Sequence, residues 1–510
     1  MSRSKVAAWG VFLILFASEA YFRHSRDWNT ASRLMLTYAL VDRSTLSING
    51  LENQTGDKAV QSGRYYSDKM PGYSLLAAVP YLVAKTVFRL PDHPLNEPGF
   101  AYWPADYWIT LLTSGLCTAA TGALLVVFAG KLGCGPNRSA LIGLSYGLAT
   151  PAALYGALAY GHQVSAFLLL ASFGVLRKGP GDRALLRSIL AGFCASYAAV
   201  VELQVGPVSA VLGFYLIALI VGGRWPIQAI WSFGIGALVP ALVLVLYNYL
   251  AFGSPWTMGY FLHANPRFRG VHGSGNPLGI GKPAWHLADD LLWGTRRGLL
   301  WYAPILLLVV PGLIALGRAR HWAMLAVSSL VMLVVFVVNL SYPEWTGGWS
   351  TGPRLLVPLL PFAMLPVAAL LGTTNHRAWT WLATVLYLVG FVVILLFEGV
   401  GGRIPEQAFG PGLPDPFSFP LRDVVWPLWR GDPLPGWLYG IRFSQNLTSL
   451  VVPGQVAALS AGRQWIQFLP LVIVQSLATA ILMWLLRTKP RVQAAPVTKL
   501  DRSEVASSRA

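Results

Sequence analysis

The chain has few charges and few cysteines, and each shortage excludes a class of protein. Asp, Glu, Lys and Arg make up only 12% of the 510 residues, about half their share in a typical soluble domain. The three cysteines, Cys117, Cys134 and Cys194, lie in or beside apolar segments. We therefore expect neither a structural disulfide nor a cysteine metal site.

Motifs for soluble cofactors are also absent. The sequence has no GxxxxGK[ST] loop and no strand-linked GxGxxG, which argues against a nucleoside triphosphate used from the cytoplasm. Its eight histidines show no HExxH-like spacing, so bound zinc has no support. No cofactor is certain, and a divalent cation beside Asp57 and Asp68 is left open.

What the chain does contain is apolar sequence, because 55% of its residues are hydrophobic. This composition predicts an all-α, polytopic membrane protein. Runs long enough to cross a hydrocarbon core of about 30 Å number roughly twelve, near residues 6–22, 107–130, 140–158, 163–176, 185–200, 205–221, 228–250, 299–317, 322–340, 353–371, 378–398 and 467–486. The first run lacks a small-residue cleavage site, so we expect a retained anchor rather than a signal peptide.

Basic residues in the short loops predict the orientation, since Lys and Arg mark the cytoplasmic side. They fall in every second connection, near 131–138, 177–187, 224, 318–320, 377 and 487–489. Both termini then face the cytoplasm of a plasma (inner) membrane. A transmembrane domain over 1–486 has long external loops at 23–106, 251–298 and 399–466, and 487–510 is expected to be a disordered cytoplasmic tail.

The short apolar segment 73–88, with Pro80 and Lys85, does not fit this alternation as a lone crossing. We expect it to lie in the outer interface; the alternative is a span that reverses everything downstream. The net charge of +17 is spread over loops on both faces. Anionic membrane lipid explains it, and no nucleic acid is expected.

The external stretch GRYYSDKMPG, Gly63–Gly72, is the best pointer to chemistry. A carboxylate can take a proton from a hydroxyl while a cation holds a neighbouring phosphate. Asp57 and Asp68 are the acid/base candidates, and Lys69 is a candidate phosphate contact. Arg64 and Tyr66 are candidate substrate contacts from the same segment. The alternatives are solvated charges, a salt bridge that holds the loop, and interfacial aromatic anchors.

Seven further candidates lie in the other external turns, each with a structural alternative. The imidazole of His162 could bind a phosphate or sugar, or cap and pack a helix. Glu202 is the only acid in the apolar stretch 188–223, and a carboxylate at the membrane edge is costly unless it is paired or hydrated. We therefore expect Glu202 to bind substrate or to pair with an Arg of a neighbouring loop. Arg296 and Arg297 bind a lipid phosphate or anchor the chain to lipid headgroups. Glu344, Trp349 and Arg354 lie in the Gly-rich loop SYPEWTGGWSTGPR, whose aromatic residues suit carbohydrate but are also common at membrane interfaces. Arg354 opens a helix, where its charge calls for an anionic partner, Glu344 or a phosphate.

This layout resembles the GT-C superfamily of integral-membrane glycosyltransferases, specifically bacterial relatives of protein mannosyltransferases and of the lipid A aminoarabinose transferase. The likeness is motif-specific at GRYYSDKMPG, AYGH and GGWSTGPR. It implies inverting transfer of a hexose or pentose from a polyprenyl-phosphate donor to a glycan, lipid or protein acceptor at the external face. The family usually has an Asp-Glu pair after the first helix. Here RDWNTASRL offers Asp27 and Asn29 but no acidic pair, and Asp57 is the nearest substitute.

Two other functions compete with a transferase. A transporter or flippase for an amphipathic anion needs polar groups reachable from both faces, whereas the acids and cations here cluster on one side; no internal repeat is visible either. If the chain were a non-catalytic assembly protein, the pair of acids Asp57 and Asp68 in one loop would have no explanation. A reactive substrate outside the cell must arrive already activated, and lipid-linked donors meet that need.

Overall fold

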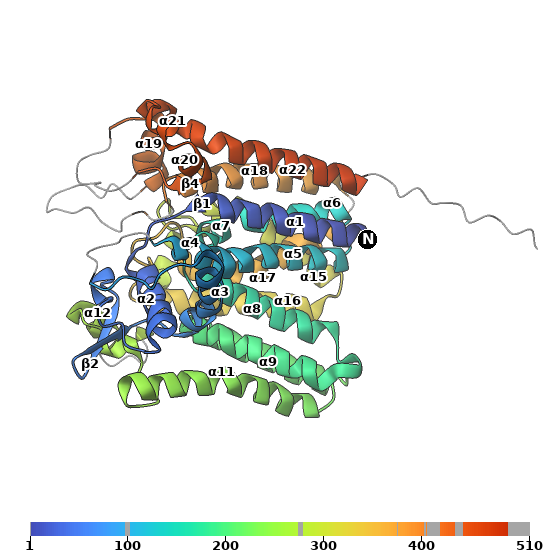
Figure 1. Cartoon of the computed structure of the whole chain (residues 1–510). Coiled ribbons are helices and arrows are strands. Elements are labelled where there is room, and N and C mark those ends of the chain that lie inside the picture. The colour runs from blue at the N-terminus through green and yellow to red at the C-terminus, as the bar shows by residue number, and fades with distance from the viewer. Residues whose placement is uncertain are drawn as a thin grey trace, which may run out of the picture.

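The computed structural model describes residues 2–96, 103–273, 279–374, 376–401, 404, 419–433 and 442–487. Within these ranges the helices are joined by turns and loops, and the strands form two short antiparallel ribbons. One pairs β1 (Phe22–Arg23) with β4 (Gln445–Asn446), and the other pairs β2 (Lys58–Gln61) with β3 (Arg64–Ser67). The long helices form one bundle (Figure 1). The chain is an all-helical, polytopic membrane protein, as its composition predicts.

Nine segments in the described ranges are long and apolar enough to cross a membrane. Several join a helix to a preceding tight turn. They are α1 (Arg3–Tyr21), α4 with α5 (Pro104–Lys131), α9 with its turn (Gly181–Val201), α10 with its turn (Leu203–Val221), α11 (Gln228–Phe252), α16 (Trp322–Leu340), α17 with its turn (Arg354–Thr373), α18 (Arg377–Gly399) and α22 with its turn (Ala461–Arg487).

The predicted number of about twelve spans is therefore too high by this criterion, and three segments account for the difference. Segment 140–158 is split into α6 (Pro136–Leu148) and α7 (Pro151–Gly156), because the Thr150 side chain accepts a hydrogen bond from the Ala152 amide and caps a new helix. Segment 163–176 is α8 (His162–Lys178), with 17 residues. Segment 299–317 breaks between α14 (Leu299–Tyr302) and the short helix Pro304–Arg318, which includes α15 (Val309–Arg318).

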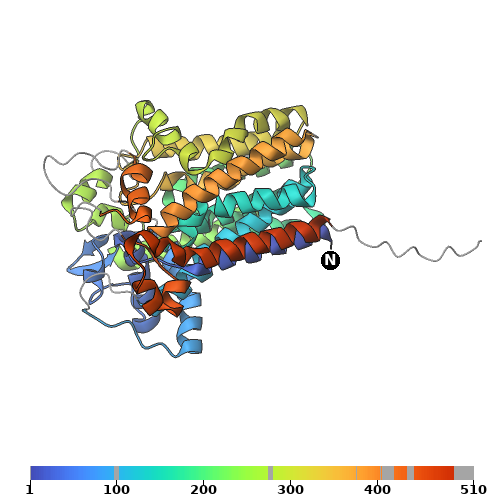
Figure 2. The same cartoon turned by 90° about the horizontal axis from the view of Figure 1, so that it is seen from above.

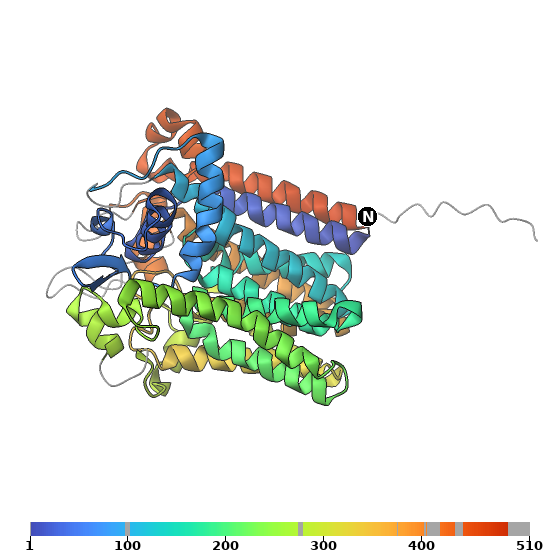
Figure 3. The same cartoon turned by 60° about the horizontal axis from the view of Figure 1, so that its bottom comes forward.

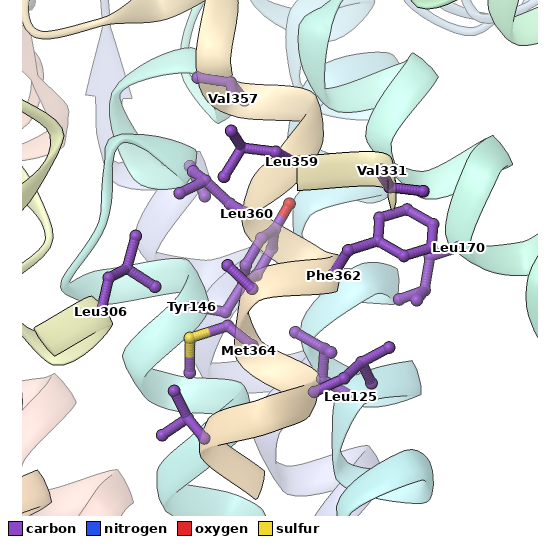
Figure 4. Close-up of a cluster of buried hydrophobic side chains, with 14 of the residues drawn as sticks. Leu125, Tyr146, Leu170, Leu306, Val331, Val357, Leu359, Leu360, Phe362 and Met364 are labelled. Carbon is purple, nitrogen blue, oxygen red and sulfur yellow. The ribbon is translucent and has the colours of Figure 1, made fainter. Parts of the chain in front are cut away.

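The core of the bundle surrounds α17 (Leu360–Thr373). In its span, 94% of the most apolar stretch is buried, against 22% in α11, as expected of a helix that is apolar all round. Figure 4 shows Phe362 and Met364 of α17 among side chains of neighbouring helices, including Leu125, Tyr146, Leu170, Leu306 and Val331. This span begins at Arg354. The packing of α17 in the core therefore fixes the position of the Arg354 backbone.

Helix α3 (Gly72–Phe88) runs crosswise to the long helices (Figures 1 and 3). Val79, Val83 and Val87 on its outer surface are each more than half exposed. A helix in this position with apolar residues on its surface fits an interfacial location rather than a crossing.

The described parts of the three long loops lie at one end of the bundle, and the N-terminus and the end of α22 lie at the other (Figure 1). Figure 2 shows α1 and α22, in blue and red, side by side. That the loop end faces outward stays a prediction. The predicted tail falls almost wholly on 488–510, outside the described residues, as do parts of loop 399–466. The remaining loop elements are α2 (Trp28–Arg43), α12 (Pro266–Gly273), α13 (Ala288–Leu292), α19 (Trp426–Arg430), α20 (Leu447–Val451) and α21 (Pro453–Ala457).

Candidate active site

A β-hairpin brings the two predicted acids together. Ser62 and Gly63 both have positive φ, 49° and 71°, the backbone of a two-residue turn whose twist suits a hairpin. The resulting register pairs Gln61 with Arg64 and Lys58 with Ser67. Asp57 precedes the first strand and Asp68 follows the second. The hairpin therefore ends with the two carboxylates beside each other.

Lys69 lies between these carboxylates. Its Nζ is 2.7 Å from Asp57 Oδ2 and 2.9 Å from Asp68 Oδ2. Burial alone would raise the pKa of Asp57, but Lys69 and His263 outweigh it and hold that pKa well below its usual range. Burial opposes the charge of Lys69, yet the two aspartates raise its pKa. Asp57 and Lys69 are thus charged at neutral pH.

The loop after α11 adds His263 to this cluster. The Ala264 amide donates to the Lys58 carbonyl at 2.8 Å, and His263 forms a β-bridge with Ala59. His263 Nε2 then lies 3.9 Å from Asp57 Oδ1 and 3.7 Å from Asp68 Oδ2. Gly259 permits this docking, because a Cβ there would lie 2.8 Å from Asp68 Cα. Two distant loops therefore build one charged cluster.

Lys69 also faces a cavity of about 110 Å³ at the same end of the bundle. The lining includes four predicted residues, Lys69, His162, Glu202 and Arg354. It also includes residues that were not among the predicted site residues, namely Asn29, Arg33, Leu203, Gln204, Tyr260, His272, Ile280, Val335, Val338, Asn339, Tyr342 and Leu355. The cavity wall is thus both cationic and apolar.

A buried ion pair forms one side of the cavity. Arg33 Nη2 of α2 is 2.7 Å from Glu202 Oε1, with side chains 2% and 8% exposed. Burial would raise the pKa of Glu202, but Arg33 and His162 lower it. The His162 Nδ1 lies 3.7 Å from the same carboxylate oxygen. Glu202 therefore has the Arg partner predicted as its structural role, and it lines the cavity as well.

Arg354 forms another side of the cavity, without an acid of its own. Its guanidinium stacks over the Tyr160 ring at 5.1 Å, and the Tyr160 hydroxyl donates to Asp27 Oδ2 at 2.5 Å. The described residues offer Arg354 no carboxylate within 4 Å, since Glu344 pairs with Arg267 at 3.3 Å instead. Of the two partners predicted for Arg354, Glu344 is thus engaged elsewhere.

Several polar atoms of the cavity have no hydrogen-bond partner in the described part of the chain. They are both ring nitrogens of His162, both amide atoms of Asn339, Nε2 of Gln204 and Nε of Arg354. His162 is only 3% exposed. A buried polar group without a partner is costly. These atoms make the cavity a candidate site for a polar ligand.

Two predicted residues of the hairpin lie away from the cavity. Arg64 is exposed at the turn end of β3. Tyr66 is 7% exposed and packs edge-on against Phe252 with ring centroids 5.4 Å apart. Arg64 therefore faces solvent and Tyr66 packs against Phe252, and neither side chain lines the cavity.

The later predicted residues also fall outside the cavity lining. Arg297 is buried and donates to the carbonyls of Ser350 and Gly348, the latter at 2.7 Å, so it holds the Gly-rich loop. Its neighbour Arg296 is half-buried, and Trp349 is 47% exposed. Neither they nor Glu344 line the cavity.

The acid cluster has the ligand types of a divalent-ion site. One atom each of Asp57, Asp68 and His263 lies within 4.8 Å of the others. Magnesium and calcium prefer such oxygen ligands. However, the Lys69 ammonium already lies within 3 Å of both carboxylates. The residues therefore fit a carboxylate pair neutralised by lysine better than one neutralised by a metal.

Comparison with known proteins gives distant structural matches. No family model matches the chain, and no curated protein sequence matches it. Among solved structures, the chain is similar to ArnT from Cupriavidus metallidurans bound to undecaprenyl phosphate, with 13% identity, a TM-score of 0.47 and coverage of 92% of this chain and 74% of that one. It is also similar to the archaeal oligosaccharyltransferase AglB from Archaeoglobus fulgidus in complex with an inhibitory peptide and a dolichol-phosphate, with 9% identity, a TM-score of 0.44 and coverage of 78% and 56%. Over most of its length the chain thus shares structural similarity with ArnT and AglB.

Proposed function

We propose that the chain is a glycosyltransferase that moves a sugar from a polyprenyl-phosphate donor to an acceptor hydroxyl at the external face of the membrane. The observation that carries the proposal is the cavity at the base of the β-hairpin. There Lys69 and Arg354 face one small space beside two carboxylates.

The charges of the cavity suit a phosphate. Arg354 has no acid within 4 Å among the described residues, and its Nε has no hydrogen-bond partner. A partly buried cation without a carboxylate partner is stabilised by an anion. Guanidinium groups bind phosphate oxygens through paired hydrogen bonds. Arg354 and Lys69 are therefore the proposed donor-phosphate contacts.

The position of the cavity suits a donor held by a lipid. His162 begins α8, Glu202 separates two spans, and Arg354 begins a third, so the lining groups lie at helix ends. Val335 and Val338 of α16 add apolar wall. All these groups are at one end of the bundle, whereas a transporter needs polar groups along a path to the other end.

In the proposed reaction, the acceptor oxygen attacks the anomeric carbon and the bond from that carbon to the phosphate oxygen breaks. The electron pair goes to the phosphate oxygen, where Lys69 and Arg354 stabilise the added charge. The acceptor proton goes to a carboxylate. The Asp57 side chain is 15% exposed and that of Asp68 is 1% exposed. We therefore assign Asp57 as the base and Asp68 as the residue that positions Lys69.

The test is transfer from a panel of radiolabelled polyprenyl-phosphate sugars to membrane extract. Asp57→Asn should lose incorporation while the protein still inserts and accumulates. The matched control is Asp92→Asn, because Asp92 is also an aspartate paired with a lysine but its side chain is 68% exposed. No incorporation from any donor by the wild type, or equal incorporation in all three proteins, would contradict the proposal.

A further inference from the structure

Asn339 is a buried polar residue of the cavity that the proposed reaction does not use. It lies one residue before the end of α16, is 2% exposed and lines the cavity. Neither its amide oxygen nor its amide nitrogen has a hydrogen-bond partner among the described residues. Both ends of one buried amide are thus unsatisfied, which is rare in folded proteins. Interchanging the two amide atoms would not change this.

The chemistry of the amide restricts what can satisfy it. Its nitrogen donates, and its oxygen only accepts. Phosphate oxygens can accept from the nitrogen, but an ionised phosphate has no proton to give to the oxygen. A bare lipid phosphate therefore leaves the Asn339 oxygen unpaired. A group with both donors and acceptors, such as the hydroxyls of a sugar, satisfies both ends.

The cavity therefore has two chemically different parts. Lys69 and Arg354 offer only donors and positive charge, which suits phosphate. Asn339 and Gln204 are neutral, and each carries an unpartnered amide atom. The ligand that matches both parts carries a phosphate and hydroxyl groups within one small volume.

Resting on the function proposed above, we infer that Asn339 is a specificity-determining residue that binds the hydroxyls of the donor sugar and so distinguishes a glycosylated lipid phosphate from the bare one. Because its amide has no partner among the described residues, Asn339 contributes little to the stability of the fold and contributes to affinity only when the sugar is present.

The experiment measures melting temperature and affinity of the full chain in detergent. The ligands are undecaprenyl phosphate and undecaprenyl-phosphate glycosides with a hexose, an N-acetylhexosamine or a pentose. Asn339→Leu should bind the preferred glycoside at least about tenfold more weakly than wild type. It should bind bare undecaprenyl phosphate as wild type does. Without ligand it should melt at the same temperature or higher, because an unpaired polar group has been removed.

Ser328→Ala is the matched control. Ser328 is on the same helix, is fully buried and has a hydroxyl without a partner in the described chain, but it does not line the cavity. This variant should keep both affinities. Asn339→Ala is the second variant, because alanine cannot overfill the site, and it should show the same loss of glycoside preference.

The outcomes separate the inference from the proposed function. If the Asn339 variants keep the preference for a glycoside, or if no glycoside binds wild type better than bare undecaprenyl phosphate, the sugar-binding role is wrong and the phosphate site stands. A lower melting temperature of both Asn339 variants without ligand would show a structural partner and also overturn it. If the wild type binds neither the bare phosphate nor any glycoside, the proposed function fails, and the inference fails with it.

Discussion

The first long loop, residues 23–106, contains two lysines that each lie between two aspartates, and the two lysines differ in their surroundings. Lys69 Nζ is 2.7 Å from Asp57 and 2.9 Å from Asp68. Lys85 Nζ is 2.5 Å from Asp42 and from Asp92. By charge and distance alone the two clusters are alike. Only the first one borders the cavity.

The surroundings explain why one cluster suits chemistry and the other suits structure. The Asp92 side chain is 68% exposed, and water screens a pair of that kind. The Lys69 cluster is more buried and borders a cavity in which the ring of His162 and the amide of Asn339 have no hydrogen-bond partner among the described residues. A charged motif is therefore a weak indicator of a site, and unsatisfied groups beside it are a stronger one.

Exchanging each lysine for a neutral residue gives the largest expected effect. Lys69→Gln should lower the transfer rate about 10²–10³-fold, because one preorganised charge beside the leaving phosphate is lost. Lys85→Gln should stay within about twofold of the wild-type rate, because Lys85 does not line the cavity. Initial rates with a radiolabelled donor measure both. Equal losses in the two variants would mean that both clusters only hold the loop.

Moving the Lys69 cluster without changing its charges should have a smaller effect. Gly259→Ala places a Cβ 2.8 Å from Asp68 Cα, so the loop carrying Tyr260 and His263 must shift. Misplacement of about 1 Å can cost as much as 10²-fold in rate, and we expect a loss of about tenfold. The control is Gly270→Ala in the same loop, where a Cβ meets nothing within 4 Å. A Gly259→Ala enzyme with the wild-type rate would contradict the proposed docking.

The ion pair beside the Lys69 cluster extends the comparison to stability. Glu202→Gln should destabilise the protein by about 3 kcal/mol, because it leaves Arg33 buried with a neutral partner. Glu344→Gln, which removes an exposed pair with Arg267, should cost less than about 1 kcal/mol. Chemical denaturation in detergent measures both.

The pH dependence of that difference follows from the lowered pKa of Glu202. A carboxyl whose pKa is lower in the folded state stabilises the fold fully above its unfolded pKa of about 4.3 and less as the pH falls below it. The gap between wild type and Glu202→Gln should therefore be full at pH 6 and shrink below about pH 4. A gap that widens in acid would contradict this assignment.

Metal removal is expected to have no effect. Lys69 already neutralises Asp57 and Asp68 at less than 3 Å, so EDTA should leave the transfer rate of the wild type unchanged. A rate that falls with EDTA and returns with magnesium or manganese would show that a metal displaces Lys69 in the working enzyme.

Much of the fold could be predicted from the sequence, because apolar run length decides most membrane spans. The errors lie where local chemistry interrupts a run, as Thr150 and Pro151 do in segment 140–158. For the site, the motif residues Asp57, Asp68 and Lys69 were found from charge in a polar loop. These residues come together because Ser62 and Gly63 form the turn of a β-hairpin. The Ser-Gly pair between two short alternating segments is a sequence pattern from which that hairpin could be predicted.

Other parts of the site could not be predicted because they depend on packing between distant segments. Arg33 meets Glu202 across a separation of 169 positions, and His263 reaches the acids only through the pairing of its loop with β2. In the sequence, Asn339 is a single polar residue near the end of an apolar span, and nothing there indicates that its amide lines a cavity. Arg297 and Tyr66 are residue types that bind phosphate and sugar, but here they have structural contacts instead. Arg297 donates to the Gly348 carbonyl of the Gly-rich loop, and Tyr66 packs against Phe252.

The most direct test of the central claim is photolabelling with a polyprenyl phosphate that carries a photoreactive group next to the phosphate. Wild type, Lys69→Gln and Lys85→Gln are labelled in detergent, and the modified peptides are identified by mass spectrometry. The account predicts label on peptides that line the cavity, around 254–263 and 335–355, lost in Lys69→Gln and kept in Lys85→Gln. Label centred on the Lys85 cluster, or unchanged in Lys69→Gln, would contradict it.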